Sequence, residues 1–150
     1  MAQPDRTIVQ GGRPKAYRPL AEDDRSLAVV AGLEAYDRGD AFLAHELLEP
    51  AWMGTDDLGE RELLQGLIKL AAAFVHAARG NPAGVAKNLR GARERLARAD
   101  PAGERLAIDV AELMLMIDAR LAGTIRAEDP PIAIPRTRRP GRDRRGGRGA

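Results

Sequence analysis

Residues 58–79 read LGERELLQGLIKLAAAFVHAAR, and this stretch decides the fold. Apolar side chains occur nearly all the way round a helix of this sequence, which is typical of a helix buried at the centre of a domain. Asp56 or Asp57 is suited to cap its start, and Gly80 is suited to its end. We therefore predict a long central helix over residues 58–79.

Four further helices are predicted around this one from caps and helical periodicity. Two precede it, over about residues 24–38 and residues 41–53, and each is followed by a glycine. A fourth helix opens at Asn81-Pro82, and a fifth spans about residues 104–121, before Gly123. No internal repeat and no strand signal is found. The short connections predict an all-α fold, a compact bundle or array of about five helices.

Both ends of the chain differ from the middle in charge and composition. Residues 1–20 carry a net charge of +3 and residues 136–150 carry +6, so the overall charge of +2 leaves −7 for residues 21–135. Residues 129–150 are rich in proline, arginine and glycine and have too few apolar residues to offset the cost of ordering. We predict one helical domain over residues 23–123, a disordered arm over residues 1–22 and a disordered tail over residues 124–150.

The composition excludes several classes of site. The chain has no cysteine, so disulfides, cysteine-ligated zinc and iron–sulfur clusters are excluded. Residues 1–20 are too polar for a signal peptide, and the longest apolar run, residues 63–78, is too short and too polar to cross a bilayer. A cytoplasmic location is therefore expected. No recognisable catalytic motif is present, and no particular cofactor is indicated.

Polar and aromatic residues share one face of the helix expected over residues 41–53. Positions three, four and seven apart lie on the same side of a helix, which aligns Phe42, His45, Glu49 and Trp52, with Glu46 at the edge. An ordinary surface pair between His45 and Glu49 would also explain this pattern.

The central helix carries a matching polar stripe. Its members are Glu62, Gln65, Lys69 and His76, which follow the same spacing, and Arg61 lies beside them, one turn before Gln65. From periodicity alone, this stripe is best explained as the single solvated face of a mostly buried helix.

Together these motifs resemble domain of unknown function family 309. The resemblance covers roughly residues 28–97 and is carried by two spaced motifs that occur in order. It rests on Phe42, His45, Glu46, Glu49, Trp52, Arg61, residues 65–68, Ala71, Ala72, His76, Gly80, Asn81 and Gly84. The resemblance implies an all-helical fold, without an established activity. It also implies that the characteristic polar and aromatic set is His45, Glu46, Glu49, Trp52, Arg61, Gln65 and His76. At the position after residues 67–68 this chain has Lys69, where the family commonly has glutamine.

Three roles for this set remain open. A structural or interaction network would lock the two helices together through mutual hydrogen bonds. A small-ligand pocket would use Trp52 as an apolar wall and the polar groups to orient a molecule. A zinc or iron site, hydrolytic or otherwise, would use His45, Glu49 and His76 with one position open for water. The spacing of His45 and Glu46 does not fit the zincin motif, which needs a second histidine where Glu49 stands.

The arginine-rich run over residues 136–150 suggests a separate role. Such runs bind nucleic-acid phosphates without sequence choice, and the run has no aromatic residue for base stacking. Any binding of nucleic acid is therefore expected to be weak and sensitive to salt. The sequence leaves the oligomeric state open, a homo-oligomer included.

Overall fold

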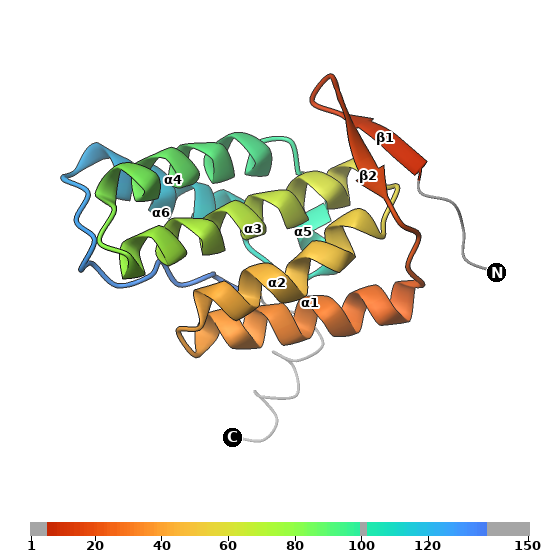
Figure 1. Cartoon of the computed structure of the whole chain (residues 1–150), viewed down its shortest axis with the longest axis horizontal. Coiled ribbons are helices and arrows are strands. Elements are labelled where there is room, and N and C mark those ends of the chain that lie inside the picture. The colour runs from red at the N-terminus through yellow and green to blue at the C-terminus, as the bar shows by residue number, and fades with distance from the viewer. Residues whose placement is uncertain (1–5, 100–101, 138–150) are drawn as a thin grey trace, which may run out of the picture.

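The computed structural model describes residues 6–99 and 102–137. In these ranges the chain forms, in order, β1 (Arg6–Gln10), β2 (Arg13–Tyr17), α1 (Glu22–Asp37), α2 (Ala41–Met53), α3 (Leu58–Ala78), α4 (Pro82–Leu96), α5 (Ala102–Arg105) and α6 (Val110–Ala122). The predicted all-α class is confirmed for the body of the protein, with one small hairpin added to it (Figure 1).

Helix α3 is the centre of the fold, as its apolar sequence predicts. It packs against α2 on one side and α4 on the other, α1 packs on α2, and α6 packs on α4. The side chains of Leu63, Leu64 and Leu70 are completely buried. The Asp57 carboxylate caps α3 by accepting a hydrogen bond from the Glu60 amide at 3.1 Å.

Two glycines allow the helices to approach closely. A Cβ atom on Gly66 of α3 would lie 2.9 Å from Cγ and Cδ2 of Leu96 on α4. A Cβ atom on Gly32 of α1 would lie 2.7 Å from Cγ of Leu48 on α2. These glycines therefore set the spacing of the helix pairs around the buried leucines.

The prediction of a disordered arm is wrong over residues 6–17, which form an antiparallel hairpin. Its register pairs Arg6 with Tyr17 and Gln10 with Arg13, which leaves a two-residue turn. Gly11 and Gly12 have φ angles of 60° and 76°, which glycine adopts without steric cost. The sequence has a Gly-Gly turn signal, but Ile8 and Val9 are adjacent and Pro14 lies in the second strand, so neither strand has a clear alternating pattern.

The predicted fifth helix is interrupted. Its expected range, residues 104–121, contains the end of α5, a break, and α6. Ala107 has a φ angle of 56°, and the Asp109 side chain caps a new helix by accepting a hydrogen bond from the Glu112 amide at 3.0 Å. An N-cap residue has non-helical backbone angles, so the helix cannot run through Asp109.

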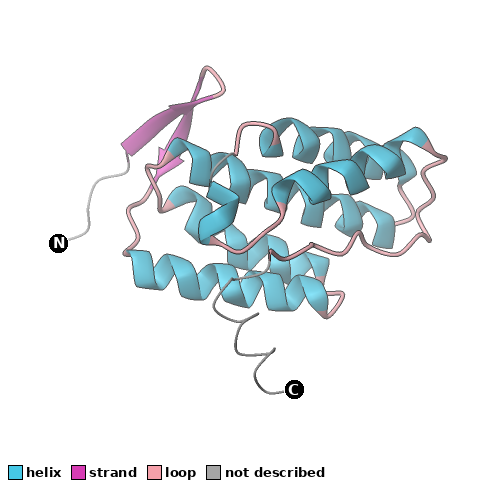
Figure 2. Cartoon of the chain, turned by 180° about the vertical axis from the view of Figure 1, so that it is seen from behind, coloured by secondary structure: helices cyan, strands magenta, loops and turns pink. Residues whose placement is uncertain are grey.

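The prediction of a disordered tail is also wrong over residues 124–137. This stretch runs back across the helices (Figure 2). Ile132 and Ile134 of this stretch are buried in the core, at 3 % and 7 % exposed. The Tyr36 hydroxyl donates a hydrogen bond to the Ile132 carbonyl oxygen at 2.6 Å, and burial raises the pKa of Tyr36 well above its ordinary value. Alternate apolar residues supply enough buried area to hold this extended segment.

The arginine-rich run lies outside the described residues from residue 138 onward, so nucleic-acid binding by this run stays a prediction. Among the helices of the described ranges, none is long and apolar enough to cross a membrane.

Replacing Gly66 with alanine tests the close contact of α3 with α4. The added methyl group would collide with buried Leu96, so we expect the free energy of unfolding to fall by about 1–2 kcal/mol, after allowing for the higher helix propensity of alanine. Gly59→Ala is the matched control, because the nearest atom to its Cβ would be 3.4 Å away. Urea unfolding should show that variant to be as stable as the natural protein or more so. Equal stability of the two variants would contradict the packing argument.

Candidate functional site

A fully buried guanidinium group lies where α2, α3 and the hairpin meet. Arg61 of α3 has no exposed surface and donates hydrogen bonds to four oxygen atoms. Its Nη1 reaches the carbonyl oxygens of Trp52 at 3.2 Å and Thr55 at 3.0 Å, while its Nη2 reaches that of Ala16 at 3.1 Å. Its Nε reaches Oε1 of Gln10 at 3.2 Å. All four acceptors are neutral.

The Trp52 ring adds to this environment. The guanidinium carbon of Arg61 lies 5.2 Å from the centroid of the ring, within the range of a cation–π interaction. Burial lowers the pKa of Arg61, but arginine starts so high that the group keeps its charge. The charge is therefore held by oriented dipoles and an aromatic face.

Gln10 connects this arginine to the predicted site residues. It is 2 % exposed and lies at the end of β1. Its Oε1 accepts hydrogen bonds from Arg61 and from Nε1 of Trp52 at 3.1 Å, and its Nε2 donates to Oε1 of Gln65 at 2.6 Å. We call Gln10, Trp52, Arg61 and Gln65 the Arg61 network. Sequence reasoning missed Gln10, since nothing local distinguishes it from any polar residue beside a turn.

A pocket opens beside the Arg61 network, between α2, α3 and α4. It has a volume of about 260 Å³. Trp52, Ile68 and Ala72 supply apolar surface. The polar lining residues are His45, Glu49, Gln65, Lys69 and Asn88. We call this cavity the Trp52 pocket.

His45 and Glu49 lie together on the α2 side of the Trp52 pocket. His45 Nδ1 is 4.0 Å from Oε2 of Glu49 and 3.6 Å from Oε1 of Glu46. The side chains of His45, Glu46 and Glu49 are 32 %, 55 % and 43 % exposed, respectively. Pairs this exposed contribute little to stability, so these residues are free for another role.

Lys69 is the cationic residue of the Trp52 pocket. Its stem lies over Gly91 of α4, where an added Cβ would be 3.0 Å from Cδ of the lysine. Burial lowers its pKa, and the neighbouring charges of Arg95 and Lys15 lower it further. Within the described part of the chain, Lys69 has no hydrogen bond and no ion pair.

His76 is placed differently from the other predicted site residues. Its Nδ1 lies 3.1 Å from Nδ2 of Asn81, beyond the end of α3, and it does not line the Trp52 pocket. Gly84 gives its ring room, because a Cβ there would lie 2.5 Å from Nδ1. Over residues 6–99 and 102–137, no three His, Cys, Asp or Glu side chains are arranged to hold a metal ion. The geometry therefore gives no support to a site built from His45, Glu49 and His76.

Comparison with known families supports the resemblance seen in the sequence. Residues 29–88 match DUF309, a domain of unknown function. No curated protein and no solved structure matches the chain. The DUF309 match begins within α1 and ends within α4, so it includes every residue that lines the Trp52 pocket. Gln10 lies outside it, on the hairpin.

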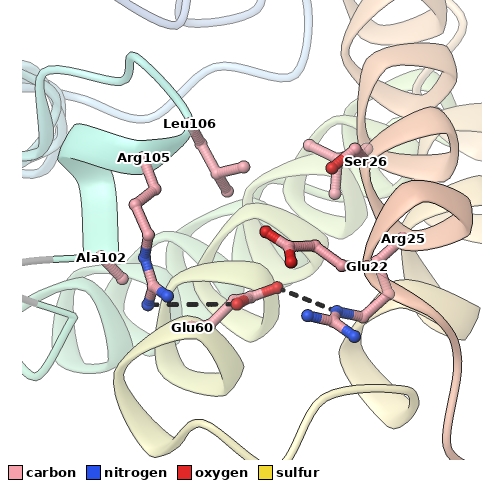
Figure 3. Close-up of a pocket in the computed structure, with 8 residues that line it drawn as sticks. Glu22, Arg25, Ser26, Glu60, Ala102, Arg105 and Leu106 are labelled. Carbon is pink, nitrogen blue, oxygen red and sulfur yellow. Dashed lines mark hydrogen bonds and ion pairs between the residues drawn. The ribbon is translucent and has the colours of Figure 1, made fainter.

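A second pocket lies outside the predicted set, between α1, α3 and α5 (Figure 3). Glu60 lies between two arginines there, with Oε1 3.4 Å from Nε of Arg25 and Oε2 4.0 Å from Nη2 of Arg105. Arg105 also pairs with Asp57 at 2.8 Å, and this contact lowers the pKa of the Asp57 carboxyl. In this cavity of about 180 Å³, both arginines of the lining are thus engaged with a carboxylate.

The Arg61 network should depend on Gln10. Truncation in Gln10→Ala leaves Nε of Arg61 and Nε1 of Trp52 without this acceptor, so we expect a loss of about 1–3 kcal/mol in the free energy of unfolding. Thr7→Ala on the same strand is the control, because Thr7 is exposed and its loss should change stability by less than about 0.5 kcal/mol. Urea unfolding measures both. A neutral Gln10→Ala variant would show that water replaces the lost acceptor.

Proposed function

We propose that this protein binds a small molecule in the Trp52 pocket, and that the Arg61 network holds two walls of that pocket in place. One observation carries the proposal. The Arg61 network satisfies its buried groups internally, yet it ends at a cavity where polar side chains retain unused hydrogen-bonding capacity.

The first support is the fixed position of the two shared residues. Trp52 and Gln65 belong both to the Arg61 network and to the lining of the pocket. A side chain that is already held by hydrogen bonds to the network loses little further conformational freedom when a ligand contacts it in the pocket. Such preorganisation lowers the cost of binding.

The second support is the contrast with the pocket of Figure 3. There the two arginines of the lining, Arg25 and Arg105, both contact Glu60. In the Trp52 pocket, by contrast, Lys69 has no such partner among the described residues. A concave, partly apolar cavity with a few convergent polar groups is the usual form of a small-molecule site.

A purely structural role for the polar set is the competing proposal. The two proposals differ at Glu49, which lines the pocket but belongs to no hydrogen bond of the Arg61 network. If Glu49 serves the pocket, Glu49→Gln should change the free energy of unfolding by less than about 0.5 kcal/mol, because its side chain is substantially exposed. If Glu49 has a buried structural role, the loss should be about 1–3 kcal/mol. Thermal and urea unfolding distinguish the two outcomes.

Binding itself is tested with a library of small polar organic fragments and the full chain labelled with ¹⁵N. We expect some fragments to shift the signals of the Trp52 indole N–H and the Gln65 side-chain amide. Ala72→Leu should abolish those shifts by filling the pocket, whereas Ala78→Leu should leave them unchanged, because Ala78 is exposed and lies outside it. A library without any hit at these two signals, or hits that survive Ala72→Leu, would refute the proposal.

A further inference from the structure

We propose that the ligand of the Trp52 pocket is a small organic monocarboxylate, with its carboxylate against Lys69 and the Gln65 amide N–H₂ and its apolar part against Trp52 and Ile68. This inference rests on the proposed function and names the chemistry of the ligand. Three features of the pocket lead to it.

The first feature is the polarity of the Arg61 network. Arg61 and the indole N–H of Trp52 are donors only, so the group that they share must be an acceptor. This requirement points Oε1 of Gln10 toward them and leaves Nε2 of Gln10 to donate to Gln65. Gln65 must therefore accept with its Oε1.

The consequence for the pocket is that Gln65 has its N–H₂ group to spare. No hydrogen bond from Nε2 of Gln65 is formed within the described residues. Arg61 and the Trp52 indole therefore determine the orientation of the Gln10 amide. The Gln10 amide in turn determines that of Gln65, which lines the pocket and keeps a donor. A ligand that meets Gln65 there needs an acceptor.

The second feature is the charge around Lys69. Lys69 is on α3, and the cations Lys15 of β2, Lys87 of α4 and Arg95 of α4 all disfavour its charged form, while Glu94 of α4 favours it. Arg95 is itself paired with Glu62 at 3.4 Å. A bound anion would relieve this repulsion and replace solvent lost by burial, whereas a bound ammonium group would add to the repulsion.

The third feature limits the anion to a single charge joined to an apolar body. Glu49 on α2 lines the same pocket, with His45 beside it, and its carboxylate would repel a dianion such as phosphate about twice as strongly as a single negative charge. Asn88 of α4 donates a hydrogen bond from Nδ2 to the Gly84 carbonyl oxygen at 2.9 Å, which leaves its Oδ1 as a free acceptor among the described residues. Lys69 and Gln65 both supply donors from α3, and a carboxylate has two oxygen atoms to accept from them. Trp52, Ile68 and Ala72 offer apolar surface to the remainder of the molecule.

The test uses two probes that share one skeleton and differ in charge, 3-phenylpropionate and phenethylamine, with inorganic phosphate as a third. Each is titrated into the full chain while the Trp52 indole and Gln65 amide signals are recorded by NMR. We expect 3-phenylpropionate to shift both signals, and phenethylamine and phosphate to shift neither. Lys69→Gln should weaken binding of 3-phenylpropionate about tenfold or more, because it removes a charge-assisted hydrogen bond.

Lys87→Gln is the matched control. It removes a neighbouring cation that is exposed and does not line the pocket, so its effect should stay within about threefold, as expected for a screened charge. Lys69→Arg should retain most of the binding. The NMR spectrum of each variant shows directly whether it is folded.

The outcomes separate this inference from the proposed function. Binding of phenethylamine in preference to 3-phenylpropionate, or equal affinity in Lys69→Gln, would overturn the carboxylate assignment and leave a ligand pocket in place. Tight binding of phosphate that depends on Lys69 would overturn the monocarboxylate in favour of a phosphate ligand. Failure of all three probes at these signals would overturn the carboxylate assignment, and failure of the fragment library as well would overturn the proposed function.

Discussion

The rest of this structure depends on one constraint, the burial of the Arg61 guanidinium among neutral acceptors. Moving a charge out of water is costly unless its hydrogen bonds are replaced. At Arg61 the replacements come from the Ala16 carbonyl on the hairpin, two carbonyls around the α2–α3 connection, and the Gln10 side chain. Each acceptor must lie in line with an N–H bond of the guanidinium group. Arg61 therefore fixes the relative positions of the hairpin, α2 and α3.

This constraint explains how a hairpin that buries little apolar surface is held against a helical body. Its strands are mostly exposed, and Val9 is 65 % exposed. What holds it is polar: Gln10 and the Ala16 carbonyl at the Arg61 network, and backbone hydrogen bonds from Arg18 to Met53 and from Leu20 to Gly54. The network needs the hairpin as much as the hairpin needs the network, because without it two polar groups of α2 and α3 would lose their acceptors.

The same network also decides which side of the Trp52 pocket carries hydrogen-bond donors. Arg61 and the Trp52 indole can only donate, so Gln10 must accept from them with its Oε1. Its Nε2 then donates to Oε1 of Gln65, and the N–H₂ group of Gln65 is left as a donor. The α3 side of the Trp52 pocket is therefore rich in donors, while Glu49 and the Asn88 oxygen give the opposite walls acceptors. A stable core and an asymmetric cavity are in this way two results of one set of contacts.

The sequence by itself determined helices α1 to α4 and the class of the fold, because caps, glycine stops and apolar periodicity are local signals. It placed α2 and α3 at nearly their observed bounds and put Trp52, Arg61 and Gln65 in one candidate set.

Only the tertiary structure decided which members of that set meet. It joined Trp52, Arg61 and Gln65 through Gln10, which lies 51 residues from Arg61, and it placed His76 with Asn81. It also ordered residues 124–137 through contacts such as that between Tyr36 and the carbonyl of Ile132, 96 residues apart. Contacts across such separations leave no periodic trace in the chain, and the energy that orders a polar hairpin or an extended tail comes from partners that the local sequence does not contain.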